Sequence, residues 1–177
     1  MPEKIIKEAQ KAYKKKDFLV AAENFRSAAE VYARSKEPLS AAEMLNNASV
    51  AFLQAGRAQE AFETASGTDR VFASADDTRR QAIALGNQAA ALEALGKLDD
   101  AVGLYENSAD LLKKSGEQEL RSTVLQSLSA VQLRLGRQLE AMASMQAGLE
   151  SIEHPSLKQR IVKKILRSPL DYLGRSS

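Results

Sequence analysis

Residues 95–112 read LGKLDDAVGLYENSADLL, and three other stretches, beginning at residues 15, 55 and 135, repeat this pattern. One column of the aligned stretches holds Lys16, Gly56, Gly96 and Gly136. Successive members of this column are forty residues apart, without insertions or deletions. Such a fixed spacing identifies an internal repeat, and the architecture must therefore be built from four similar units.

Each unit contains two apolar stripes that are typical of amphipathic helices. In the third unit the stripe after the glycine consists of Leu98, Ala101, Val102, Tyr105, Ala109 and Leu112. The stripe before it consists of Ala82, Leu85, Ala89 and Leu92. Glycine ends the first helix because it adopts the left-handed conformation without a Cβ clash, and Lys16 must end its helix without this advantage. A second column contains Ala21, Ala61, Ala101 and Ala141, small enough for two helix backbones to cross closely.

The composition also favours helices, since 44% of residues are hydrophobic, only 5% are aromatic and Trp is absent. We therefore predict an all-α fold of four helix hairpins followed by a C-terminal capping helix. The expected hairpins occupy about residues 1–35, 36–75, 76–115 and 116–154, which together form one region at 1–154. Residues 155–177 are the expected capping helix and tail.

These columns resemble the tetratricopeptide repeat over residues 3–152. The matching features are the turn glycine, the alanine column, the apolar residues Leu45, Leu85 and Leu125, and the small residues Ser49, Ala89 and Ser129. The resemblance implies a right-handed superhelix that serves as a non-catalytic adaptor or scaffold for protein–protein interaction. Tetratricopeptide units are usually about 34 residues long, so the helices of this chain belong to a longer type.

Long helix pairs of this type are also similar to the arrays of soluble NSF attachment proteins. The stretches YENSADLLKKSG (residues 105–116) and SPLDYL (residues 168–173) resemble parts of that family. Its members engage an ATPase through an acidic or leucine-bearing C-terminal end, which is not evident in LGRSS, residues 173–177. This second resemblance implies an alternative function as a membrane-associated adaptor.

The tetratricopeptide resemblance implies that the first helices of successive units line a concave groove for a peptide or a partner helix. The predicted partner-binding residues are Gln10, Tyr13, Lys14, Asn46, Asn47, Val50, Leu53, Asn87, Ala90, Gln126, Ser127 and Arg134. Asn47 and Asn87 occupy the same repeat position, and their amides could read the backbone of an extended peptide. The alternative is that each Asn is solvated or donates a hydrogen bond to a neighbouring side chain.

One unit departs from the pattern, because Asp69 occupies a column held elsewhere by Ala29, Ala109 and Leu149, and Gly67 precedes it closely. Helix propensity falls at this point, which indicates a softer joint. The alternative is that Asp69 pairs with a neighbouring Arg or faces solvent at a local offset.

The C-terminal segment also allows two interpretations. Leu157, Ile161 and Ile165 form an apolar stripe, and the basic residues around it are Lys158, Arg160, Lys163, Lys164 and Arg167. A repeat array needs a final helix that covers its last apolar face, so we expect a cap. The alternative is a basic amphipathic helix that binds an anionic membrane surface.

The sequence offers little for catalysis, since it contains one His and no Cys. We predict no catalytic residues, no cofactor and no metal site, because no phosphate loop or metal-ligand spacing is found. Residues 41–154 contain ten Lys and Arg against sixteen Asp and Glu, so the net charge of +2 comes from the two ends. This mild imbalance does not favour nucleic acid as a partner. Without a secretory signal or an apolar span, the expected location is cytoplasmic.

Overall fold

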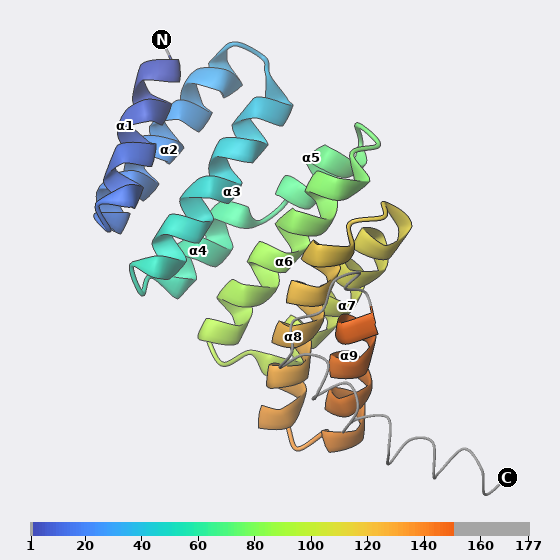
Figure 1. Ribbon diagram of the computed structural model, residues 1–177. Coiled ribbons are helices and arrows are strands. Elements are labelled where there is room, and N and C mark those ends of the chain that lie inside the picture. The colour runs from blue at the N-terminus through green and yellow to red at the C-terminus, as the bar shows by residue number, and fades with distance from the viewer. Residues whose placement is uncertain (1, 151–177) are drawn as a thin grey trace, which may run out of the picture.

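The computed structural model describes residues 2–150, and in this range every regular element is an α-helix (Figure 1). The elements are α1 (Pro2–Lys14), α2 (Phe18–Arg34), α3 (Pro38–Gln54), α4 (Ala58–Ala65), α5 (Thr68–Ala73), α6 (Thr78–Ala94), α7 (Leu98–Lys114), α8 (Gln118–Arg134) and α9 (Gln138–Glu150). The all-α prediction is confirmed. The predicted capping helix lies outside the described residues.

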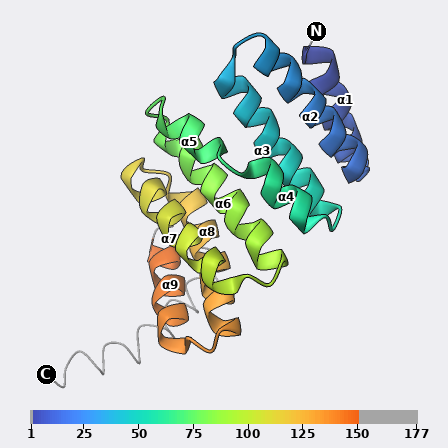
Figure 2. The ribbon, with the colours of Figure 1, turned by 180° about the vertical axis from the view of Figure 1, so that it is seen from behind.

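The helices pack as sequential hairpins in two layers. The hairpins are α1–α2, α3 with the broken pair α4 and α5, α6–α7, and α8–α9. The helices α1, α3 and α6 lie in front of α2, α4 and α7 in Figure 1 and behind them in Figure 2. The first helix of every hairpin therefore belongs to one layer, which is the arrangement that the two stripes of each repeat predict.

The turns between helices recur every twenty residues, which is half the period visible in the sequence. Each turn contains a residue with positive φ, namely Lys16 (63°), Lys36 (59°), Gly56 (75°), Asp76 (56°), Gly96 (74°), Gly116 (76°) and Gly136 (75°). The next backbone N–H then closes the turn on a carbonyl five residues back, as in Asp17 to Ala12 at 3.0 Å. Lys16, Lys36 and Asp76 adopt this conformation despite their Cβ atoms, at an energetic cost that glycine avoids.

The alanine column forms the close contact inside each hairpin. Ala21, Ala61 and Ala101 are fully buried, and Ala141 is almost so. In two hairpins a serine of the first helix donates a hydrogen bond to the carbonyl of this alanine. The Ser49 hydroxyl is 2.7 Å from the Ala61 oxygen, and the Ser129 hydroxyl is 2.8 Å from the Ala141 oxygen. These bonds fix the register of each helix pair.

The second hairpin differs from the others because its second helix is interrupted between α4 and α5. Ser66 has an extended backbone conformation, and Gly67 follows with φ of 81°. The second helix is thus broken at the predicted joint. Asp69 is half-buried and forms no ion pair with an Arg among the described residues. Its carboxylate accepts a 2.8 Å hydrogen bond from the Gln88 amide instead.

Candidate functional site

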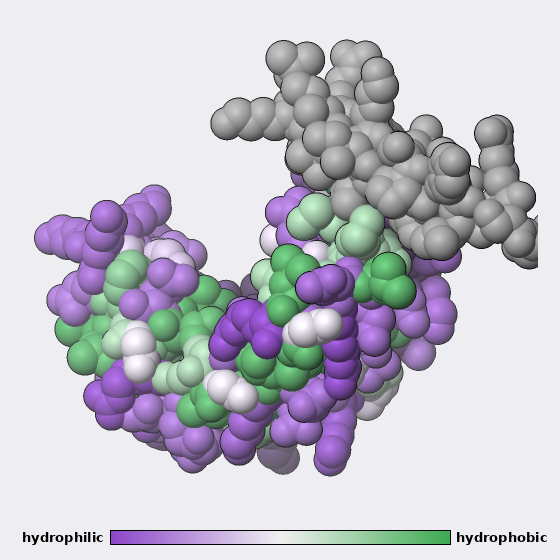
Figure 3. Space-filling model, turned by 90° about the horizontal axis from the view of Figure 1, so that it is seen from below, coloured by the Kyte–Doolittle hydropathy of each residue, from purple (hydrophilic) through white to green (hydrophobic). Residues whose placement is uncertain are grey.

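The layer formed by the first helices faces the hollow of the curved molecule. Figure 3 shows this hollow between the N-terminal hairpin on the left and the later hairpins on the right. Figure 1 looks into the same face and shows α1, α3 and α6 across it. The residues predicted to contact a partner belong to α1, α3, α6 and α8, so the structure brings their helices to one side of the molecule.

A cavity of about 470 Å³ lies on this side between α1 and α3. Its lining residues are Gln10, Tyr13, Lys14, Phe25, Asn47 and Val50. All but Phe25 are predicted partner-binding residues. Phe25 belongs to α2 and contributes a buried ring to the cavity wall. Five of the predicted residues therefore lie around one concavity at the N-terminal end of the face.

Asn46, in contrast, is not a groove residue, and its prediction is corrected by the structure. Only 6% of its surface is exposed. Its Oδ1 accepts hydrogen bonds from the Thr68 hydroxyl at 3.3 Å and from Asn87 Nδ2 at 3.4 Å. The helix break brings Thr68 beside α3, so Asn46 satisfies polar groups of the interior instead of facing a partner.

The two asparagines at the shared repeat position, Asn47 and Asn87, have different surroundings. Asn87 hydrogen-bonds to a neighbouring side chain, as the alternative interpretation expects. Asn47 borders the cavity instead, and no other described side chain hydrogen-bonds to its amide. The two residues share a repeat position, but only Asn47 borders the cavity, so their amides do not form one continuous row of groups along the face.

The remaining predicted residues differ in accessibility. Leu53 is half-buried against core residues of the first two hairpins, such as Phe25 and Phe52. Ala90 is half-buried against core residues of the last two hairpins, such as Tyr105 and Leu128. Gln126 is exposed and Ser127 is half-buried, both on α8. These four residues lie farther along the hollow and do not line the cavity that Gln10 and Val50 line.

Arg134 is exposed but already paired. Its guanidinium donates to Glu93 Oε1 at 2.9 Å, and the Tyr105 hydroxyl donates to Glu93 Oε2 at 3.0 Å. Burial, reinforced by the Glu93 carboxylate, raises the pKa of Tyr105 well above its ordinary value, so the phenol stays protonated and keeps donating. Arg134 therefore neutralises Glu93 and is not a free cation for a partner.

Other ion pairs also join successive repeats. They are Arg80 with Glu43 at 3.2 Å, Arg79 with Glu117 at 2.7 Å, and Arg137 with Asp99 at 2.6 Å. None of the lysines within residues 2–150 takes part in such a pair. Lysines without an ion-pair partner are therefore most frequent in α1 and in the turn after it.

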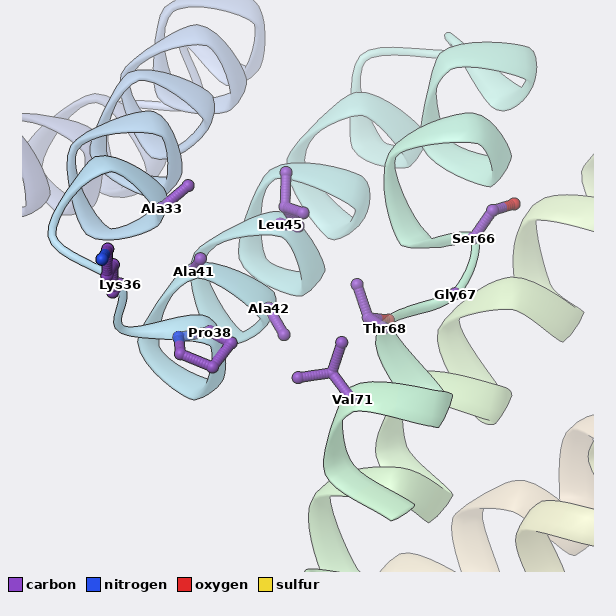
Figure 4. A pocket seen from close by; sticks show the side chains of 10 residues that line it. All are labelled: Ala33, Lys36, Pro38, Ala41, Ala42, Leu45, Ser66, Gly67, Thr68 and Val71. Atoms are coloured by element: carbon purple, nitrogen blue, oxygen red, sulfur yellow. The ribbon is translucent and has the colours of Figure 1, made fainter. Parts of the chain in front are cut away.

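A second cavity, of about 380 Å³, adjoins the helix break (Figure 4). It lies between α2, the start of α3 and the link from α4 to α5, and Leu45 and Val71 point toward it from two sides. Sequence reasoning did not predict this cavity. The sequence feature that could have indicated it is the pair Gly67 and Asp69, because the helix breaks there between α4 and α5 and the cavity lies beside the break.

Two kinds of feature are absent from the described region, a metal-binding cluster and a membrane-spanning helix. Within residues 2–150, no group of three His, Cys, Asp or Glu side chains is arranged to hold a metal ion. None of the helices in that range is both long enough and apolar enough to cross a membrane. The predicted basic residues Lys158, Arg160, Lys163, Lys164 and Arg167 lie outside the described part of the chain.

Comparison with known proteins adds one match. A model of the soluble NSF attachment protein (SNAP) family matches residues 3–173. This range includes both stretches that resemble the family, and it covers nearly the whole sequence. No curated protein matches the chain.

Proposed function

Because this chain belongs to the soluble NSF attachment protein family, we propose that it is an adaptor whose concave face holds the helices of a partner protein. Proteins of this family are non-catalytic helical adaptors that bind partner proteins. The proposed partners are those that the family implies, namely SNARE-type helical complexes and an NSF-type ATPase. The general tetratricopeptide interpretation, in which the groove takes an extended peptide, is less favoured by this membership.

The observation that supports this proposal is the hollow face with its cavity between α1 and α3. Helical partners bind by placing the apolar side chains of one face into a groove. Tyr13 and Val50 offer apolar surface there, and Gln10 and Asn47 offer amides at its border. Farther along the hollow, Ala90 is small and Gln126 is exposed, so a helix could approach α6 and α8 without a bulky obstacle.

The test is binding of the full chain to a purified SNARE-type four-helix complex, measured by fluorescence anisotropy. The double substitution Ala90→Glu with Gln126→Glu places two carboxylates in the hollow and should weaken binding at least about tenfold. The matched control is Ser27→Glu with Asn107→Glu, which likewise replaces two neutral side chains by carboxylates, at exposed positions of α2 and α7 on the other layer. Equal affinities for the two double variants would show that the hollow is the wrong surface.

A second candidate function, attachment to a membrane surface, rests on the basic C-terminal sequence and on the extent of the family match, which reaches residue 173. Each Lys or Arg near an anionic surface contributes about 1 kcal/mol to binding. The full chain should therefore sediment with phosphatidylserine vesicles, and deletion of residues 156–177 should abolish this binding. Retention of vesicle binding after the deletion would assign it to another part of the chain.

A further inference from the structure

The cavity between α1 and α3 combines an apolar interior with a polar border. Tyr13, Phe25 and Val50 supply the apolar surface, and Gln10, Lys14 and Asn47 supply the polar groups. Its volume of about 470 Å³ lies in the range of cavities that bind small molecules. It can therefore admit one large apolar side chain of a partner, such as that of Leu or Phe.

The polar border is not engaged by the protein itself. Among the described residues, none forms a hydrogen bond or ion pair with the side chains of Gln10, Lys14 or Asn47. This differs from the other polar residues predicted for the face, because Asn87 bonds to Asn46 and Arg134 bonds to Glu93. The groups around this cavity are thus available to a partner without breaking an internal contact.

Lys14 is the charged residue among those that line the cavity. Lys7 and Lys14 are both exposed, and their spacing of two helical turns places them on the same stripe of α1 as Gln10. Glu3 also lies on this stripe, but it is two helical turns before Gln10, at the start of α1. On the opposite side, α3 contains no charged residue after Glu43. A carboxylate beside the cavity would therefore meet Lys14 and lie far from Glu3, whereas a cationic partner would be repelled.

We propose that this cavity is an anchor site for a partner helix that inserts one large apolar side chain and places a carboxylate, one turn away, against Lys14. This inference rests on the proposed function, because it assigns a distinct subsite to the same concave face. The partner's sequence should contain an apolar residue with acidic residues three before it and four after it. Residues at this spacing share one face of a helix.

The site can be tested with a defined probe and the full-length protein. The probe is a capped peptide of about 18 residues, long enough to populate a helix on an Ala and Gln background, with one Leu between two Glu at the stated spacing. Two matched peptides replace both Glu by Gln, or Leu by Ala. Amide NMR signals of the isotope-labelled chain report where each peptide binds and how tightly.

The Glu peptide should shift signals of α1 and α3 and bind more tightly than either matched peptide. Lys14→Gln should weaken its binding about two- to fivefold, as expected for an exposed ion pair, and should not affect the Gln peptide. Lys15→Gln is the control, because Lys15 is equally exposed but does not line the cavity. Val50→Glu should weaken binding at least about tenfold, since a carboxylate would occupy the apolar interior.

Three results would overturn the anchor site: no saturable shifts in α1 and α3, equal binding of the Glu and Gln peptides, or equal effects of Lys14→Gln and Lys15→Gln. Both lysine substitutions are at exposed positions, so neither threatens folding. If the peptide result is negative while the SNARE-type complex still binds the hollow, the anchor is wrong and the adaptor function remains. If the peptide binds as described but the complex does not, the adaptor function is wrong and the anchor remains.

Discussion

Gln88 on α6 donates a 2.8 Å hydrogen bond to the carboxylate of Asp69 on α5, and both residues depart from the repeat pattern. The repeat column of Gln88 holds Ala48 and Leu128 in the neighbouring units, and both of these are buried and apolar. The same Gln88 amide lies 3.2 Å from the carbonyl oxygen of Ala65, at the end of α4. A polar residue in one repeat thus satisfies groups left by the helix break in the preceding repeat.

Gln88→Leu should lower the free energy of unfolding by about 1–3 kcal/mol, because the carboxylate of Asp69 and the carbonyl of Ala65 would lose a buried donor. Urea denaturation followed by circular dichroism measures this change. The control Gln54→Leu alters an exposed glutamine in the last turn of α3 and should change stability by less than about 0.5 kcal/mol. If the two variants had similar free energies of unfolding, the hydrogen bonds of Gln88 at the helix break would make no net contribution to stability.

Ser129→Ala should destabilise the last described hairpin by about 0.5–1.5 kcal/mol, because it removes the hydrogen bond to the carbonyl of Ala141. Ser27→Ala is a suitable control, since Ser27 is exposed in the middle of α2 and its side chain bonds to no other described helix. The difference between the two variants in urea unfolding isolates the interhelical bond. An equal effect of both would assign the loss to helix propensity or local packing.

Most of the fold follows from the sequence because each unit repeats the same physical requirements. Alanine must occupy the close crossing, and a residue that tolerates positive φ must follow each first helix. The twenty-residue recurrence of the turns was not predicted, because Lys36 and Asp76 occupy turn positions where glycine would have revealed it. A left-handed lysine or aspartate is compatible with many other local structures, so the sequence alone does not identify it.

The site was predicted less completely, and Asn46 and Asn47 show why. Adjacent residues of a helix point about 100° apart, so only one of them can face the hollow fully. Asn47 borders the cavity, whereas Asn46 contacts Thr68 across the helix break. Because the position of Thr68 depends on how α5 is redirected after Gly67, repeat columns cannot specify which asparagine is buried.

Asp77→Ala should lower stability at neutral pH by about 0.5–2 kcal/mol, because Asp77 caps α6. Its carboxylate accepts a 2.9 Å bond from the backbone N–H of Arg80 and a 2.6 Å bond from the guanidinium of that residue. The backbone bond is the largest cause that holds the pKa of Asp77 below its ordinary value. The stabilisation is therefore present above the unfolded pKa of about 3.9 and is lost as pH falls through the lower folded value.

Urea unfolding of the wild type and of Asp77→Ala at several pH values between neutral and strongly acidic measures this dependence. The difference between the two proteins should be constant near neutrality and shrink once the pH falls below about 4. Asp110→Ala is the control at neutral pH. This exposed carboxylate on α7 makes no hydrogen bond to a described residue, and its removal should change the free energy of unfolding by less than about 0.5 kcal/mol. A difference that persists unchanged in acid would exclude the carboxylate as its source.

Two substitutions on α7 should change stability in opposite directions. Ala101 is fully buried where α7 crosses α6, so Ala101→Leu must force the helices apart and should cost about 1–3 kcal/mol. Gly103, two residues later, is exposed, has negative φ, and would place a Cβ with no atom within 4 Å. Gly103→Ala should therefore raise stability by up to about 1 kcal/mol through helix propensity alone.

Thermal and urea unfolding of both variants would measure these changes. Because the two positions lie on the same helix, a difference in stability between the variants reports how closely each position is packed. The alanine column requires contact between backbones, so the loss at Ala101 should persist when Gly103→Ala is added to the same chain. If Ala101→Leu is tolerated as well as Gly103→Ala, then α6 and α7 are not in close contact at this column. The repeat would in that case owe its alanines to helix propensity and not to the crossing that sets the curvature of the binding face.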